Sequence, residues 1–182
     1  MQRHSLSGTT MGTRYSAVFF AAAGVDEAAI AADLFAAVNS VDQQMSSWKP
    51  ESELSRLNRA PAGQWQVVPK ALYCVLLTAL RVGEQSRGAF DIGVGDLVDA
   101  WGFGAGQQQP DEQQIRRLQQ RVYRAATDLL EIDHAHNRVR KRAPVSLDLS
   151  GIAKGYGVDA LAHCLDGLGI RSYLVGIDGE MR

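Results

Sequence analysis

The sequence predicts an α+β fold with a mostly antiparallel sheet and packed helices. Two observations support this prediction. Segments with the alternating pattern of strands are interleaved along the chain with segments of helical periodicity, and residues 122–133 and 137–142 have the pattern of two strands joined by a short turn. At 182 residues, the chain is long enough for one domain with a core and too short for two full ones. We therefore expect a single domain spanning residues 1–182.

The first expected strand covers residues 13–20, where apolar and polar side chains alternate. Residues 26–45 show the clearest helical periodicity of the chain, with apolar side chains three or four positions apart, and Asp26 is the expected N-cap of this helix. The other elements expected from their patterns are, in order, a helical turn at 51–58, a brief strand at 65–68, a helix at 69–86, a polar helix at 110–121, a helix ending near Leu168 and a strand at 173–177.

Two stretches are rich in glycine. The segment Gly88–Gly106 contains six glycines and is expected to be a loop, and a loop of this length calls for a functional explanation. Residues 145–149 alternate like a strand and are followed by an expected turn at Ser150-Gly151 and by a helix with Lys154 in its first turn. Such an arrangement presents free main-chain N–H groups and a cation to an anion, most often a phosphate.

The carboxylate of Asp148, just before this expected turn, is a possible acceptor for a sugar hydroxyl, a ring N–H or a metal-bound water. A purely structural interpretation stays open, in which the stretch is a plain strand–turn–helix connection whose glycines only allow close packing. The glycine spacing matches neither the Walker motif nor the dinucleotide-binding fingerprint, so neither of those sites is predicted.

The composition is that of an ordinary globular protein, with 46% hydrophobic and 21% charged residues. A net charge of −1 gives no sign of a nucleic-acid surface, and we expect no nucleic-acid partner. The single basic run, at residues 138–142, is interpreted as the solvated face of a strand. No apolar run is long enough to span a membrane, and the first four residues lack the apolar core of a signal peptide. A cytoplasmic protein and one whose leader has been removed are both compatible with this.

Cysteines and histidines give weak signals. Cys74 and Cys164 lie among apolar residues without metal-site spacing and are expected to be small core residues, with a disulfide between them left open. His134 and His136 have the spacing of a metal pair, but we favour a solvent-exposed hairpin tip because no further ligand of suitable spacing accompanies them.

Four segments together resemble the FAD:protein FMN transferases, also called ApbE-type flavin transferases. The segments are Gly8-Thr9-Thr10-Met11-Gly12-Thr13; Met45-Ser46-Ser47-Trp48 with Ser52-Glu53-Leu54-Ser55-Arg56-Leu57-Asn58; Gly88-Ala89-Phe90-Asp91 with Leu97 and Trp101-Gly102-Phe103-Gly104; and residues 148–156 with Asp159. They occur in the family's order and extend over nearly the whole chain. The resemblance implies a T-fold-like flavin transferase domain.

The resemblance also implies an activity. Family members split the pyrophosphate of FAD with a magnesium ion, attach FMN to a threonine or serine hydroxyl of a partner redox protein and release AMP. The acceptors are subunits of membrane redox complexes. The enzymes act on the exported side, in the periplasm or at the inner membrane, often as lipoproteins. A membrane would then be reached only through a possible lipid anchor, which we expect to be absent from this chain.

Residue by residue, the resemblance implies a site for FAD and a site for Mg²⁺. Met11 packs on the flavin nucleotide, and Trp48 replaces the family's usual tyrosine as a stacking platform. The other implied cofactor-binding residues are Ala89, Phe90 and Asp91 along the nucleotide, Asp148 hydrogen-bonded to the flavin, and Lys154 facing the cofactor. Gly151 offers its main-chain carbonyl to magnesium, with further ligands expected beyond residue 182. The general base is unassigned.

Two departures from the family pattern change these expectations. Gly93 and Asp96 occupy positions where the family usually has threonine and proline, and family members continue well past Arg182. We therefore expect an amino-terminal part of a flavin transferase domain, inactive by itself. The alternatives are a module that binds FAD without transferring FMN, a magnesium-dependent FAD pyrophosphatase that yields FMN and AMP, and a non-catalytic interaction domain.

Overall fold

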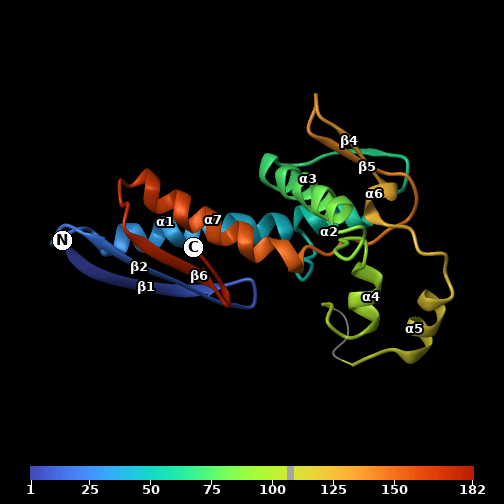
Figure 1. The fold of residues 1–182 in the computed structure, drawn as a ribbon, viewed down its shortest axis with the longest axis horizontal. Helices are drawn as coiled ribbons and strands as arrows, with labels where there is room; N and C mark the ends of the chain where they lie inside the picture. The colour runs from blue at the N-terminus through green and yellow to red at the C-terminus, as the bar shows by residue number, and fades with distance from the viewer. Residues whose placement is uncertain (106–108) are drawn as a thin grey trace. The chain divides into compact units, whose positions relative to one another are not determined.

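A computed structural model describes residues 1–105 and 109–182, so Gly106 at the end of the expected loop lies outside the described residues. The chain divides into two compact units (Figure 1). Unit 1 comprises Met1–Asp42 and Ile152–Arg182, and unit 2 comprises Gln43–Gly151. That the two units form a single domain stays a prediction. No helix in the described part of the chain has the length and apolar character needed to cross a membrane.

Unit 1 contains an antiparallel sheet of four strands. Their order is β1-β2-β6-β7, with β1 at Gln2–Thr10, β2 at Thr13–Ala21, β6 at Tyr173–Ile177 and β7 at Glu180–Met181. Helix α1 (Glu27–Met45) and helix α7 (Ser150–Gly167) run along one side of this sheet (Figure 1). The expected helix at 26–45 is confirmed, and so is its N-cap, because the Asp26 carboxylate accepts the Ala29 N–H at 3.0 Å.

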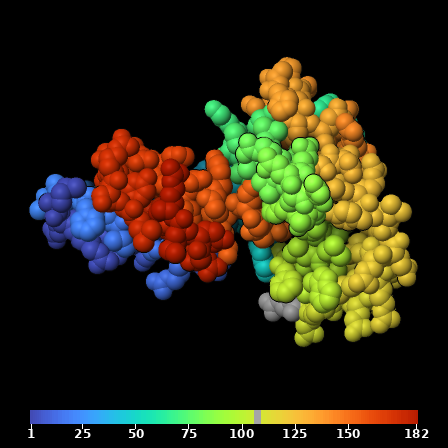
Figure 2. Space-filling model, in the orientation of Figure 1, coloured from blue at the N-terminus to red at the C-terminus, as the bar shows by residue number. Residues whose placement is uncertain are grey.

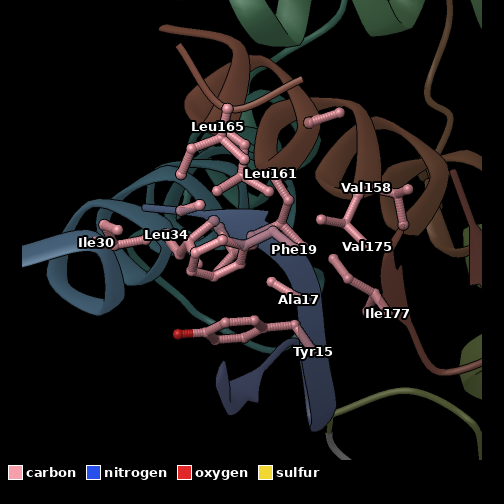
Figure 3. Packing of buried hydrophobic residues seen from close by; sticks show 14 residues of the cluster. Tyr15, Ala17, Phe19, Ile30, Leu34, Val158, Leu161, Leu165, Val175 and Ile177 are labelled. Atoms are coloured by element: carbon pink, nitrogen blue, oxygen red, sulfur yellow. The ribbon is translucent and has the colours of Figure 1, made fainter. Parts of the chain in front are cut away.

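The core of unit 1 lies between the sheet and the two helices. Phe19 of β2 is fully buried, and its ring points toward Leu34 of α1 and Leu161 of α7 (Figure 3). Alternate residues of β2 face inward, as do residues of α1 three or four positions apart, because these are the periods that bring side chains to one face. The buried cluster consists of Tyr15, Ala17, Phe19, Ala21, Ile30, Leu34, Val38, Val158, Leu161, Ala162, Leu165, Ile170, Val175 and Ile177.

The β1–β2 hairpin closes with a two-residue turn at Met11-Gly12. Thr10 pairs with Thr13, and φ is 48° at Met11 and 71° at Gly12. Positive φ at both central residues is the geometry of a type I′ turn, whose twist suits a two-residue hairpin. Strand β1 was not predicted, because its residues are mostly polar and give no clear apolar alternation.

The described part of unit 2 contains five further helices and a three-stranded antiparallel sheet of order β3-β5-β4. The helices are α2 (Glu53–Arg59), α3 (Lys70–Gln85), α4 (Gly95–Ala100), α5 (Glu112–Gln119) and α6 (Ala126–Leu129); the strands are β3 (Trp65–Val67), β4 (Leu130–Asp133) and β5 (Arg138–Lys141). The β4–β5 hairpin lies at the surface beside α3 (Figures 1 and 2), where the Tyr73 hydroxyl and His134 Nδ1 are 2.7 Å apart.

Most elements expected in unit 2 are confirmed, but three segments differ. The expected loop at 88–106 contains helix α4. The expected strand at 122–133 begins only at Leu130, because residues 126–129 form α6. Residues 145–149 belong to neither sheet, and α7 begins directly at Ser150, so there is no separate turn before it. The main chain of this segment bonds instead to loops, as in the 2.8 Å bond from the Asp148 N–H to the Ile92 carbonyl.

Three side-chain predictions are also corrected or refined. The basic run is not uniformly solvated, because Lys141 is 4% exposed and donates to the Asn58 carbonyl at 2.6 Å. Cys74 is exposed rather than a core residue, whereas Cys164 is half-buried against the core of unit 1, and both are free thiols. His136 lies exposed at the tip of the β4–β5 hairpin, as expected, and is paired with Asp133.

Candidate functional site

The sequence-predicted site residues fall in both units. Unit 2 carries Trp48, Ala89, Phe90, Asp91, Asp148 and Gly151, and unit 1 carries Met11 and Lys154.

The Trp48 side chain is 57% exposed although it is among the largest apolar groups of the chain. Its segment is well held. The Ser46 hydroxyl accepts the Trp48 N–H at 3.1 Å, and the Ser46 carbonyl accepts the hydroxyl of the fully buried Ser52 at 2.6 Å. An indole exposed on a fixed main chain can stack on a planar ring with little loss of conformational freedom. Trp48 thus has the properties required of the predicted platform.

Phe90 and Asp91 line a cavity of about 250 Å³ in unit 2. Its walls are the carboxyl-terminal half of α3, the segment after this helix, and the first residues of α6 with the segment before them. The lining residues are Ala79, Leu80, Gly83, Glu84, Arg87, Gly88, Phe90, Asp91, Ile92, Tyr123, Ala125, Ala126 and Thr127. Ala89, which sequence comparison with the family places beside them, is itself exposed and does not line this cavity.

The Asp91 carboxylate already has several partners within the protein. Oδ1 accepts the main-chain N–H of Gly93 at 2.8 Å and that of Ala126 at 3.1 Å, and Oδ2 accepts the Tyr123 hydroxyl. These bonds tie the segment at 91–93 to the segment at 123–126, more than 30 residues later. Asp91 therefore shapes the cavity wall, and its contact with a nucleotide stays a prediction.

The pKa of Tyr123 can be measured to test its contact with Asp91. Burial, followed by the hydrogen bond and charge of Asp91, raises the pKa of Tyr123 to about 12 from 10.0. Because the folded-state pKa is raised, this phenol favours folding fully below pH 10, and that contribution is lost as the pH rises through about 12. We expect Asp91→Asn to move the pKa of Tyr123 back toward 10. Ultraviolet absorbance of the phenolate measures it, with Tyr123→Phe identifying the signal, and an unchanged titration would contradict the contact.

Asp148 is 8% exposed and lies at the start of α7. Its Oδ1 accepts the Ser150 N–H at 2.9 Å, and its Oδ2 accepts the Ser150 hydroxyl at 3.1 Å. A carboxylate is favoured at this position because the first N–H groups of a helix lack partners and carry partial positive charge. The bonds explain why Asp148 is so well fixed. The bonds between Asp148 and Ser150 are compatible with the phosphate-site interpretation and with the purely structural one.

Gly151, the predicted magnesium ligand, lies in the first turn of α7 close to Phe90. A Cβ atom at Gly151 would come within 3.1 Å of the Phe90 ring, so the absence of a side chain allows this approach. Magnesium prefers several oxygen ligands with near-octahedral geometry. The described residues contain no cluster of three histidine, cysteine, aspartate or glutamate side chains suited to a metal ion. By themselves they do not fit a magnesium site, and the role of Gly151 stays a prediction.

In unit 1, Met11 has an unusual main-chain conformation. A positive φ is uncommon for a residue other than glycine, asparagine or aspartate, and it costs on the order of 1 kcal/mol. The Met11 side chain reaches Gly157 of α7, where an added Cβ would lie 3.0 Å from its terminal methyl group. The type I′ turn accounts for this conformation, and the contact between Met11 and a ligand stays a prediction.

Lys154, the other predicted site residue in unit 1, has a carboxylate partner. Its Nζ lies 2.7 Å from Asp178 Oδ2, and this hydrogen bond raises the pKa of Lys154. The side chain is 31% exposed, so the cation is reachable from solvent. A phosphate oxygen arriving here would have to share or displace the Asp178 partner.

Sequence reasoning missed the contributions of Tyr123, Asn58 and Lys141 to unit 2. Tyr123 follows a polar helix and has no local signal that would link it to Asp91. Asn58 and Lys141 were predicted to belong to a helical turn and a solvated strand face, yet they bond to each other across 83 positions. Only long-range pairing information would have identified them.

Comparison with known proteins shows which family the chain resembles. The ApbE family model matches residues 11–182. The chain is 35% identical to the FAD:protein FMN transferase of Vibrio cholerae serotype O1 over 183 residues, covering 97% of this chain and 53% of the relative. It is also 35% identical to the Haemophilus influenzae protein of the same name over 190 residues, covering 98% and 53%. The chain thus spans about half the length of the curated relatives it matches.

Solved structures give the same result for the fold. The flavin transferase ApbE from Vibrio cholerae superimposes with a TM-score of 0.90 at 33% identity, over all of this chain and 59% of that one. The apo flavinyl transferase ApbE from Pseudomonas stutzeri gives a TM-score of 0.87 at 28% identity, over all of this chain and 60% of that one. The predicted α+β, ApbE-like fold is therefore confirmed, and the chain belongs to the ApbE family.

Proposed function

We propose that the chain carries FAD-binding residues of a flavin transferase that moves FMN from FAD to a threonine or serine hydroxyl of a partner redox protein. The observation that carries this proposal is the match of residues 11–182 to a family whose curated members are named FAD:protein FMN transferase. The exposed, well-held indole of Trp48 supports it from the structure, since FAD has two planar ring systems that need stacking partners.

The proposed reaction is a phosphoryl transfer. The acceptor hydroxyl oxygen forms a bond to the phosphorus of the FMN half, the bond from that phosphorus to the bridging oxygen breaks, AMP leaves, and the hydroxyl proton passes to a base. Such reactions depend mainly on positioning and on neutralising charge. Lys154 offers a cation for a phosphate, and Trp48 a surface for a ring. The proposed transfer depends on magnesium, which would supply further charge neutralisation when bound.

The acceptor and the location complete the proposal. By the family resemblance, the acceptor is a subunit of a membrane redox complex, and the reaction takes place on the exported side, in the periplasm or at the inner membrane. Fractionation of cells that carry the natural gene tests the location, and enrichment in the cytoplasm would contradict it.

The proposed activity can be tested by mixing the product of the natural gene, which includes this chain, with FAD, magnesium and an acceptor peptide that contains a candidate threonine, because the chain by itself is expected to be inactive. A gain in peptide mass of one FMN, lost when a chelator removes the magnesium, is the expected result. Free AMP without that gain would favour a pyrophosphatase instead. Saturable FAD binding with no AMP would favour a binding module, and absence of FAD binding would favour a non-catalytic interaction domain.

Lys154→Ala is expected to weaken FAD binding by about 10- to 100-fold, the usual effect of losing one hydrogen bond to a charged group. The free energy of unfolding should fall by no more than about 1 kcal/mol, which is the most that an exposed ion pair usually contributes. Arg171→Ala is the matched control, because Arg171 also forms an exposed ion pair in unit 1, with Asp166 at 3.1 Å. Calorimetric FAD titration and chemical denaturation measure the two effects. Equal FAD affinity in Lys154→Ala and the control would exclude the phosphate contact.

A further inference from the structure

The side chain of Asn58, at the end of α2, forms two hydrogen bonds with the main chain of Leu147. Its Nδ2 donates to the Leu147 carbonyl at 2.9 Å, and its Oδ1 accepts the Leu147 N–H at 2.9 Å. The orientation of the amide is fixed by its partners, since only the oxygen can accept an N–H and only the nitrogen can donate to a carbonyl. Asn58 thus pairs with Leu147 much as a residue of a neighbouring strand would.

The segment that Asn58 holds has no neighbouring strand of its own. Residues 145–149 form no regular element and belong to neither sheet. Buried main-chain groups need partners, and here they come from side chains and loops. Loops also bond to this segment: the Ile92 carbonyl accepts the Asp148 N–H at 2.8 Å, and the Gly95 N–H donates to the Ser146 carbonyl at 3.0 Å. Asn58 therefore adds two side-chain bonds to the main chain of this segment.

Asn58 is itself held from the other side by a buried lysine. Lys141 of β5 donates from Nζ to the Asn58 carbonyl at 2.6 Å and is 4% exposed. Burying an ammonium group is costly unless it is hydrogen-bonded, so loss of this contact would reduce stability. A series of bonds therefore leads from β5 through the last turn of α2 to Leu147.

Leu147 immediately precedes Asp148, whose two carboxylate oxygens bond to Ser150 at the start of α7. A shift of the main chain at Leu147 would carry Asp148 with it, because the two residues share a peptide plane. We propose that Asn58, held by Lys141, is a positioning residue that fixes the direction of the Asp148 carboxylate. Its importance for flavin binding rests on the proposed function, in which Asp148 contacts the flavin.

Amide hydrogen exchange tests the structural half of this inference without any ligand. In Asn58→Ala, the Leu147 amide exchanges faster simply because its acceptor is gone, so the informative amide is that of Ser150, which Asn58 does not touch. We expect the Ser150 amide to exchange about tenfold faster, the equivalent of one lost hydrogen bond, while core amides of α3 such as that of Leu76 keep their rates. An unchanged rate at Ser150, or a uniform increase that includes α3, would overturn the proposal.

Two further variants sharpen this measurement. Arg59→Ala is the matched control, because the neighbouring Arg59 also bonds to a main-chain carbonyl, that of Pro50 at 2.6 Å, but has no link to Leu147; it should leave the Ser150 rate unchanged. Asn58→Asp retains an acceptor for the Leu147 N–H and loses the donor. Its Ser150 rate should lie between those of the wild type and Asn58→Ala, and this variant decides the question if Asn58→Ala does not fold.

FAD titration tests the functional half. Asn58→Ala should weaken FAD binding by about tenfold in the wild-type background and have no further effect when Asp148→Asn is already present, because the two residues act through one carboxylate. Additive losses would overturn the link to Asp148. If the wild-type chain binds no FAD, the proposed function fails, whereas the exchange measurement still decides whether Asn58 positions Asp148.

Discussion

Replacing Trp48 with alanine is expected to weaken FAD binding by about 1–3 kcal/mol, the range found when an aromatic platform is removed from beneath a stacked base. The indole is 57% exposed, so its loss should leave the core of unit 2 intact. Calorimetric titration of FAD measures the affinity, and chemical denaturation checks that stability is retained.

Substitutions at two tryptophans provide the controls for this prediction. Trp48→Tyr restores the residue that the resemblance implies at this position and should recover most of the affinity. Trp65→Ala removes an indole of β3 that is already covered by Arg138 and Arg140, whose guanidinium carbons lie 5.4 and 4.6 Å from the ring centre. It should leave FAD affinity unchanged. Equal affinities of Trp48→Ala and the wild type would refute the platform role.

The largest expected effect on stability comes from Phe19→Ala. Phe19 is fully buried between the sheet and the helices of unit 1 (Figure 3), and truncating a buried phenylalanine costs about 3–5 kcal/mol through lost transfer free energy and the cavity left behind. Urea denaturation followed by circular dichroism measures the change in the free energy of unfolding.

The adjacent Phe20 is a matched control for this substitution. It has the same chemistry and lies on the same strand, but its side chain points to the other face and is 42% exposed. Phe20→Ala should therefore cost much less than Phe19→Ala. Similar losses for the two variants would mean that the assigned inward face of β2 is wrong.

The elements that the sequence predicted well are those with a strong period and a buried face. Helix α1 shows this, because its apolar residues recur at helical spacing and pack on the core of unit 1. Strand β1 was missed because it lies at the edge of its sheet and is largely polar. Helix α4 was missed because its six residues are too short to show a period and lie in a glycine-rich segment.

For the candidate site, the sequence indicated the residues but not their partners. The positions of Trp48, Asp91 and Asp148 came from the resemblance to the family. Their environments depend on contacts between distant segments, such as the bond from Tyr123 to Asp91 and the pairing of Asn58 with Leu147. No local pattern encodes such contacts. The burial of Lys141 was missed for the same reason, since a basic run normally indicates a solvated surface.

A crystal structure of the chain with bound FAD would test the central claim most directly. The account predicts a ring of the dinucleotide stacked on the Trp48 indole, with the Asp148 carboxylate within hydrogen-bonding distance of the ligand. FAD bound elsewhere, with the Trp48 ring uncovered and Asp148 bonded only to Ser150, would contradict it.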